Sequence, residues 1–168
     1  DGVLIELNPT TANITVGGVP SPTPTTDPGT TAPVLVGRVL ATKPVTVGLY
    51  DAVNTLIAST VANTDGTFSM TAPAGSYTVV ATASGFLSAQ GPAILTAGQT
   101  TTKGTVSLLA GDIDGNNVID QYDAMTIGMN YNTAVPDAAD LNADGIINVL
   151  DLEDLAANYR ASGALFWQ

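Results

Sequence analysis

The sequence contains no cysteine and no histidine, so disulfides, thiol chemistry and zinc sites built on these residues are excluded. Only four residues are Lys or Arg, against fifteen Asp or Glu, and the formal net charge is −11. A chain this poor in basic residues lacks the electrostatic footprint of a nucleic-acid-binding protein. No apolar run reaches 18 residues, so we expect no membrane span. No charged-then-apolar leader opens the sequence, and a secreted form would therefore be a mature or trimmed product.

Catalytic groups are scarce as well. The sequence has no glycine-rich phosphate loop, and paired carboxylates, as in a glycosidase, are the remaining option for an active site. Seven of the fifteen acids, however, occupy positions in two repeated loops, and Asp27, Asp51 and Asp65 have the setting of turn residues. We therefore predict a protein that is not an enzyme.

Aromatic residues are 5% of the chain and charged residues 11%, whereas Thr, Ala, Val and Gly are abundant. Short runs of small β-branched residues favour strands over a large helical core. Turn signals such as Asp65-Gly66 separate the runs. The sequence thus predicts a mainly β fold with a small α part, in which residues 34–109 form a seven-strand β-sandwich. The predicted strands are Val34–Leu40, Val45–Tyr50, Leu56–Val61, Thr67–Thr71, Ser76–Ala83, Ala93–Leu95 and Thr101–Leu108.

Two segments precede this sandwich. Residues 1–16 alternate apolar and other side chains, with apolar residues at Val3, Ile5, Leu7, Ile14 and Val16, which predicts one or two strands. Such a segment is too short to fold alone. It is either the end of an upstream domain or a donor strand that pairs with another sheet. Residues 17–33 form a Pro/Thr linker, which we expect to be extended and semi-rigid.

The acids are concentrated near the C-terminus. Ten of the fifteen lie between Gly111 and Asp154, most of them in two twelve-residue loops, DIDGNNVIDQYD (residues 112–123) and DLNADGIINVLD (residues 140–151). The loops align residue by residue at an offset of 28. Oxygen-bearing side chains occupy positions 1, 3, 5, 9 and 12 of both: Asp112, Asp114, Asn116, Asp120 and Asp123 in the first, and Asp140, Asn142, Asp144, Asn148 and Asp151 in the second.

This spacing is the one that a hard divalent cation requires. Ca²⁺ takes six to eight oxygen ligands, and a twelve-residue loop supplies them from these positions together with the backbone carbonyl of position 7, here Val118 or Ile146. Position 6 must turn sharply, which Asn117 and Gly145 permit. Flexible loops rich in protein oxygens suit calcium better than magnesium. A polar surface loop would explain one such sequence, but two copies in register predict two calcium ions as the cofactors.

Each loop is followed by a helical pattern, at residues 121–130 and 149–159, and we expect no helix before either loop. The predicted apolar faces consist of Met125, Ile127 and Met129 in the first helix and Leu152, Leu155 and Ala156 in the second.

This duplicated loop-and-helix unit, residues 110–160, resembles the dockerin family of secreted calcium modules. Dockerins bind cohesin domains and assemble extracellular complexes, so the resemblance implies a cohesin-like partner and an extracellular location. By the same resemblance, Gln121, Tyr122, Val149 and Leu150 would contact the partner. The opposing interpretation is that Tyr122 and Leu150 pack between the helices. The Ser-Thr pair frequent at these positions in dockerins is missing, and the two halves differ, which argues against two equivalent binding poses.

The predicted sandwich also resembles known β-sandwich families. Residues 63–86, NTDGTFSMTAPAGSYTVVATASGF, resemble the carboxypeptidase-regulatory-like or Cna-B-like β-sandwiches, which usually serve as spacers or stabilising modules. A sandwich followed by a dockerin is also similar to the X-module–dockerin pairs of scaffold proteins.

Two functions therefore remain open. The first is a non-catalytic assembly module that binds a cohesin-like protein through calcium-ordered helices. The alternative is a calcium-stabilised subunit of an extracellular fibre, joined to copies of itself when the N-terminal strand adds to a neighbouring sandwich. Residues 161–168, ASGALFWQ, are predicted to be an apolar tail that packs the chain end back near the first loop, or alternatively a sticky end for a partner.

Overall fold

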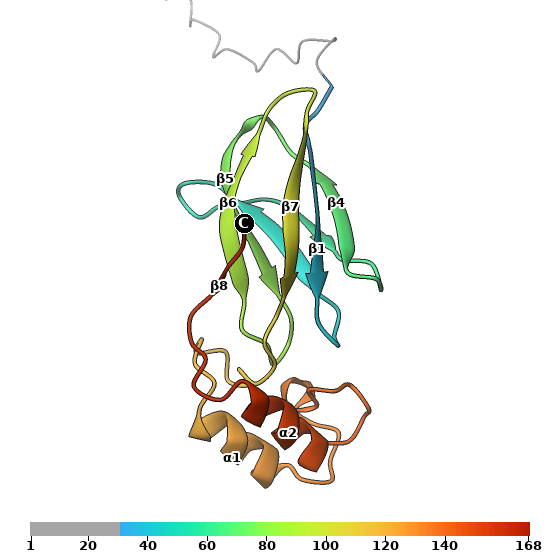
Figure 1. Ribbon diagram of the computed structural model, residues 1–168, viewed down its shortest axis with the longest axis vertical. Helices are drawn as coiled ribbons and strands as arrows, with labels where there is room; N and C mark the ends of the chain where they lie inside the picture. The colour runs from blue at the N-terminus through green and yellow to red at the C-terminus, as the bar shows by residue number, and fades with distance from the viewer. Residues whose placement is uncertain (1–30) are drawn as a thin grey trace, which may run out of the picture.

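The computed structural model describes residues 31–168. The predicted strands at residues 1–16 and the linker up to residue 30 lie outside this part. The described chain is elongated, with a β-sandwich at one end and two short helices at the other (Figure 1). Seven strands form the sandwich, in close agreement with the prediction; the main difference is that the sixth begins at Ala89 rather than at Ala93. The strands are β1 Val34–Leu40, β2 Thr46–Tyr50, β3 Leu56–Val61, β4 Thr67–Thr71, β5 Gly75–Thr82, β6 Ala89–Leu95 and β7 Thr100–Ser107.

The strands form two sheets that enclose one apolar core. The order is β4-β1-β7 in the three-stranded sheet and β3-β2-β5-β6-β8 in the five-stranded sheet, where β8 is Leu165–Phe166. Strand β6 shows the period-two pattern most clearly, because its odd-numbered residues are buried and its even-numbered residues are exposed. Leu35, Val47, Leu49 and Val79 are fully buried between the sheets. This alternation fixes the register, since a one-residue slip would turn the apolar side chains of a strand to solvent.

The C-terminal residues complete the sandwich. Strand β8 pairs in parallel with β6, and the Trp167 N–H donates to the Gln90 carbonyl at 2.8 Å. On the opposite side, Gly104 N–H of β7 donates to the Gln168 carbonyl at 2.9 Å. The end of the chain thus bridges the two sheets. It packs against the sandwich, whereas the sequence predicted packing near the first loop; only the preceding residues lie beside that loop.

The helical module has a separate small core. Helix α1 spans Gln121–Met129, helix α2 spans Val149–Ala157, and a one-turn 3-10 helix, η1, spans Asp137–Ala139. The expectation that no helix precedes either loop is therefore wrong for the second loop. A cluster of buried side chains fills the space between these elements and includes one residue from the β5–β6 connection of the sandwich: Leu87, Ile119, Ile127, Ala139, Leu141, Ile147 and Leu155.

Specific contacts fasten the helical module to the sandwich. The Thr42 hydroxyl donates to the Leu141 carbonyl at 2.6 Å, and the buried Lys43 ammonium donates to the backbone carbonyl and the carboxylate of Asp137. Gly85 lies so close to the Ala138 carbonyl that a Cβ atom there would be 2.1 Å from the oxygen. Its φ of +81° also favours glycine. The two parts are consequently held in close apposition.

Candidate metal centre

A buried aspartate organises each loop. The Asp123 carboxylate accepts the N–H groups of Ile113 (2.7 Å) and Asp114 (3.2 Å) on one oxygen and that of Asp120 (2.8 Å) on the other. Asp123 is fully buried, so these three charge-assisted bonds replace its lost hydration. Asp151 makes the same three contacts 28 residues later, to the N–H groups of Leu141, Asn142 and Asn148.

Other side-chain oxygens of the loops also accept backbone N–H groups, at equivalent positions in both copies. In the first loop, Asp112, Asp114 and Asn116 accept backbone N–H groups from Asn117, Asn116 and Val118. The corresponding acceptors in the second loop are Asp140, Asn142 and Asp144, and their donors are Gly145, Asp144 and Ile146. The two loops therefore fold alike although only three of their twelve positions have the same residue and nine do not.

Left-handed backbone positions repeat with the same offset. Asn117 has φ +65° and Gly145 has φ +89°, which agrees with the sharp turn predicted at position 6. Position 4 is also left-handed, with Gly115 at +74° and Ala143 at +60°. An alanine is strained in this region, so the loop conformation must be imposed by its surroundings in the second copy.

Helix starts are built into the loops. Asp120 and Asn148 occupy the N-cap positions, and their side chains accept the N–H groups of Tyr122 (2.7 Å) and Leu150 (2.8 Å). Asp123 and Asp151 complete the reciprocal half of each capping box. Capping of this kind stabilises a nine-residue helix that would be marginal alone.

Each loop is also paired with the segment that follows the other helix. Ile119 of the first loop exchanges backbone hydrogen bonds with Arg160 and Ala161, at 2.9 Å each. Ile147 of the second loop exchanges them with Asn132 and Thr133, at 2.8 and 2.7 Å. The pairing obeys the 28-residue offset, so the module has approximate twofold symmetry in its backbone.

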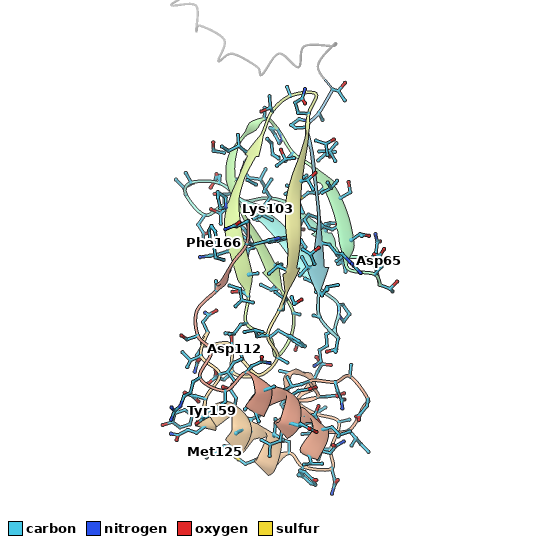
Figure 2. All side chains as sticks on the ribbon, in the orientation of Figure 1. Asp65, Lys103, Asp112, Met125, Tyr159 and Phe166 are labelled. Atoms are coloured by element: carbon cyan, nitrogen blue, oxygen red, sulfur yellow. The ribbon has the colours of Figure 1, made fainter. Side chains whose placement is uncertain are left out.

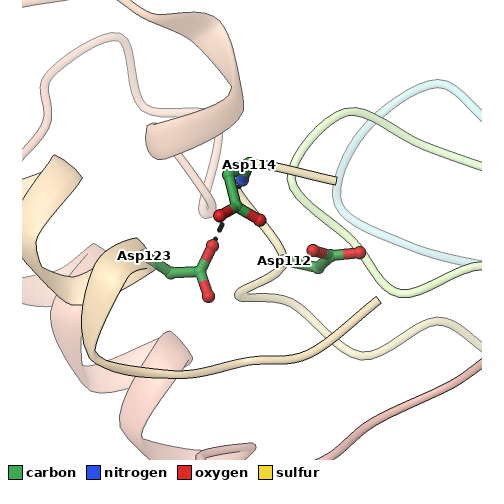
Figure 3. A group of neighbouring side chains, drawn as sticks. All are labelled: Asp112, Asp114 and Asp123. Atoms are coloured by element: carbon green, nitrogen blue, oxygen red, sulfur yellow. Dashed lines mark hydrogen bonds between the residues drawn. The ribbon is translucent and has the colours of Figure 1, made fainter. Parts of the chain in front are cut away.

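Carboxylates of the first loop converge without a counter-charge. Oxygen atoms of Asp112, Asp114 and Asp123 lie within 4.8 Å of one another. Figure 3 shows the three side chains. Burial raises the pKa of the Asp112 carboxyl, and the negative charges of Asp123 and Asp114 raise it further. Within residues 31–168 the one ion pair is that of Lys43 with Asp137, and it lies away from this cluster. The oxygen-only donor set and the unbalanced charge both fit a hard divalent cation.

Four of the predicted ligand positions, 3, 5, 7 and 9, make other contacts in one loop or both. The Ile146 carbonyl, at position 7, accepts the Asn148 side-chain amide at 3.1 Å. Asp120 and Asn148, at position 9, direct one oxygen to the helix N-terminus. The side-chain amide of Asn116 donates to Asp114 at 3.0 Å, and that of Asn142 donates to Asp144 at 3.1 Å. These amides would have to turn their oxygens inward to act as ligands.

The four predicted partner contacts are all on the surface. Gln121 is exposed, and Tyr122 (58%), Val149 (58%) and Leu150 (48%) are exposed too, so Tyr122 and Leu150 do not pack between the helices. The predicted apolar faces are partly wrong, because only Ile127 and Leu155 of those six residues are buried. Met125, Met129, Leu152 and Ala156 are exposed. In Figure 2, Met125 and Tyr159 both lie on the helical module and not on the sandwich.

Residues that join the two parts were missed from the sequence. Nothing local identifies Thr42 and Lys43 as junction residues. For Trp167 a signal existed in the strands that receive it. A Cβ on Gly91 would be 1.8 Å from the Trp167 carbonyl, and a Cβ on Gly104 would be 3.3 Å from that of Gln168. Glycines inside strands mark a close backbone approach, which here is the C-terminal segment.

No family model and no curated protein matches the sequence. The structure is similar to solved chains of a type II cohesin–X-dockerin complex from Acetivibrio cellulolyticus. Chains from an N-terminal and a C-terminal interface mutant of that complex align with TM-scores of 0.58 and 0.57, at 22% sequence identity. Each alignment covers 77% of this chain and 96% of the other. The likeness shows that this chain shares their fold, including a β-sandwich of the kind found in such assembly systems.

Proposed function

We propose that this chain is a non-catalytic, extracellular assembly module that binds two calcium ions and uses its helical end to bind a cohesin-like protein. The observation that carries the proposal is the duplicated loop. Two twelve-residue segments place equivalent oxygens on equivalent backbone donors, and the first of them also brings three carboxylates together. Coincidence of sequence would not reproduce the hydrogen bonds, the left-handed positions and the cross-pairing together.

The chemistry of the first loop supports a cation. Two carboxylates at about 4.8 Å repel by roughly 3 kcal/mol at an effective dielectric constant of about 20. Three such groups without a cationic side chain would weaken the metal-free loop. A bound Ca²⁺ supplies the missing positive charge, and metal binding is then coupled to loop folding. Asp112, Asp114, Asn116, Asp120 and Asp123 would hold the ion, with the Val118 carbonyl, and the second loop would use the residues at the same positions.

The surface of the helical end supports a protein partner. Apolar side chains are exposed at the starts of both helices, Tyr122 on α1 and Val149 and Leu150 on α2, with Met125 one turn further along α1. Exposed aromatic and Met residues are the types that anchor protein interfaces. The solved chains with this fold come from complexes described as cohesin–X-dockerin, and on that likeness we assign a cohesin-like domain as the partner. The dockerin resemblance implies an extracellular location, where millimolar calcium suits loops of modest affinity.

Calorimetry would test the cation and the partner separately. Titration of the chelator-treated chain with Ca²⁺ should show two sites, and Asp123→Asn should abolish one of them. A type II cohesin from Acetivibrio cellulolyticus would then be titrated in calcium and in chelator. Binding is expected only in calcium. Tyr122→Ala combined with Leu150→Ala should weaken it at least about tenfold.

Phe166→Ala is the matched control, because this residue is exposed (70%) on the sandwich and not on the helical face. Absence of calcium binding would overturn the metal assignment. Calcium binding without any cohesin affinity would leave the cation site intact and overturn the choice of partner. Equal losses in the helix-face variant and in the control would place the interface elsewhere.

A further inference from the structure

The sandwich has four lateral edges, and three of them are protected. Strand β7 is covered by the C-terminal segment through the Gly104–Gln168 bond, and β8 is only two residues long. Strand β4 has polar outward residues and begins beside the Arg38–Asp65 contact. Strand β3 is the remaining edge of the five-stranded sheet. Natural proteins block such edges with charges, prolines or bulges that twist them away.

Strand β3 carries neither charge nor proline. Its sequence is LIASTV, and Leu56 (50%), Ile57 (38%) and Val61 (61%) are exposed. A bulge is present near its start, where the register shifts between Leu49 and Tyr50 of β2. The last four residues pair regularly with β2. An uncharged and largely apolar edge strand of six residues can pair with an added strand.

The backbone of β3 is available on its outer side. Ala62 N–H donates to the Val45 carbonyl, so this pair is hydrogen-bonded across the β2–β3 ladder. In an antiparallel ladder the hydrogen-bonded and non-hydrogen-bonded pairs alternate. Thr60 and Ala58 therefore bond to β2, whereas the N–H and C=O groups of Ser59 and Val61 point away from it. An added strand would meet these groups, of which the Val61 carbonyl also accepts the Thr60 hydroxyl at 3.5 Å.

We propose that β3 accepts residues 3–7 of a second copy of this chain. These residues lie outside the described part, and the argument for them is their sequence. Val3, Ile5 and Leu7 alternate with Leu4 and Glu6, which gives one wholly apolar face and places the single charge on the other. The donor run of five residues is one residue shorter than β3. An uncharged acceptor strand imposes no repulsion on such a donor.

The chain is long enough for a neighbouring copy to be the recipient. Strand β1 begins at the pole of the sandwich opposite the helices (Figure 1). Residues 8–33, 26 in all, separate the donor run from it. The Pro/Thr linker, residues 17–33, accounts for seventeen of them, and at about 3.1 Å per residue it would extend by roughly 50 Å. That reach is about twice the length of a seven-residue strand. Because the donor and the acceptor are different surfaces, the contact is heterologous, and repeated addition makes a filament.

The test uses the full chain in millimolar calcium, measured by light scattering after size separation over a range of concentrations. The wild type should exceed the mass of one chain as concentration rises. Ile5→Asp, which puts a charge on the apolar face, should stay monomeric. Ser59→Pro removes an outward N–H and should also stay monomeric, while Ser59→Ala should assemble like the wild type. Far-UV circular dichroism would establish that the Ser59→Pro chain is folded. Ile5→Asp lies outside the described core and does not depend on that point.

A labelled peptide of residues 1–9 supplies a second readout. It should bind the full-length Ile5→Asp chain, and the same peptide carrying Ile5→Asp should not. Wild-type chain that stays monomeric at every concentration overturns the proposal. Assembly that survives Ile5→Asp or Ser59→Pro overturns it too, because another surface must then be responsible. A monomeric wild type alongside peptide binding would mean that the segment pairs with its own sandwich. Calcium and cohesin binding are measured separately, so either result leaves the proposed function independently testable.

Discussion

Replacement of Trp167 by alanine should destabilise the sandwich far more than its position near the chain end suggests. Its side chain is 1% exposed and lies in the core between the sheets, with its ring edge-on to Phe68 at 5.6 Å. The indole N–H donates to the Gly104 carbonyl at 2.7 Å. Lys103 donates to the Trp167 carbonyl at 2.7 Å and lies over the ring.

The expected magnitude follows from these contacts. Truncation of a buried aromatic residue to alanine costs about 3–5 kcal/mol, through lost burial and the cavity that remains. The lost hydrogen bond leaves a backbone carbonyl without its partner, which adds about 1 kcal/mol. Partial collapse of the site offsets part of this. We expect the free energy of unfolding to fall by about 4 kcal/mol, a large fraction of the 5–15 kcal/mol typical of a domain.

Urea unfolding followed by far-UV circular dichroism would measure this loss, in millimolar calcium. Phe166→Ala is the control, since the neighbouring side chain is exposed and its removal should cost below about 1 kcal/mol. Figure 2 shows Phe166 on the sandwich beside Lys103. A change below about 1 kcal/mol for Trp167→Ala, or equal changes for the two variants, would refute the placement of the C-terminal strand in the core.

Removal of the metal should change the environment of Trp167 as well. Residues 160–163 bond to the first loop, including Gly163 N–H to the Asn117 carbonyl at 2.7 Å, and continue directly into β8. Trp167 is the one tryptophan of the chain, so its emission reports on this segment. We expect a red shift in chelator and in Asp112→Asn, and a smaller one in the matched second-loop variant Asp140→Asn. Equal red shifts in the two variants would show that the first loop does not constrain residues 160–163 and β8 more than the second loop does.

Three further predictions concern titration and backbone strain. Because the folded pKa of Asp112 is raised above its ordinary value near 3.8, the metal-free chain should lose stability as pH rises through that raised pKa, and Asp112→Asn should flatten the loss in urea titrations run with chelator. Burial lowers the pKa of Lys103 from 10.5, so stability should rise with pH between the lowered value and 10.5, and thermal melts of Lys103→Met should lack this increment. At position 4 of the loops, Gly115→Ala should destabilise by about 1 kcal/mol and Ala143→Gly should not, since both positions are left-handed; chemical unfolding that shows no loss for Gly115→Ala, or a clear loss for Ala143→Gly, would contradict the backbone assignment.

Local patterns in the sequence predicted the parts of the fold that depend on local physics. Period-two alternation and turn residues located all seven sandwich strands, since strand burial is read from neighbouring side chains. The 28-residue repeat predicted two equivalent loops, and the structure gives them the same hydrogen bonds. The starts of the two helices could be predicted as well, because the capping residues Asp120 and Asn148 lie within the loops. Whether cations occupy the loops stays a prediction.

Longer-range features could not be predicted from the same patterns. The destination of Trp167 depends on space left by Gly91 and on the gap between β6 and β7, which only the assembled sandwich creates. The helix faces were wrong because a nine-residue helix that packs through a single buried residue leaves most apolar side chains exposed. For α1 that residue beyond the loop is Ile127, while Met125 faces solvent. Apolar residues at helical spacing indicate a face but not what covers it.

The repeat makes the loops alike, but the rest of the chain makes them unequal. The segment paired with the first loop runs on into β8 and the sandwich core. The segment paired with the second loop runs on to η1, where Asp137 meets Lys43. Hydrogen bonds from Ser84 and Lys43 lower the pKa of the Asp137 carboxyl, so this junction is charged at neutral pH. Equal ions in the two loops would therefore act on different parts of the sandwich.

The same inequality applies to the surface. Gln121-Tyr122 and Val149-Leu150 occupy equivalent positions on a nearly symmetric backbone, yet one pair is polar and aromatic and the other is aliphatic. A partner shaped to one pair would meet a different surface after a half-turn, and specificity is a difference between such affinities. The module should accordingly bind in a single orientation. Because the sandwich is fixed to the helices through Thr42, Lys43 and the C-terminal strand, that orientation would also set the direction in which the rest of the chain extends from the partner.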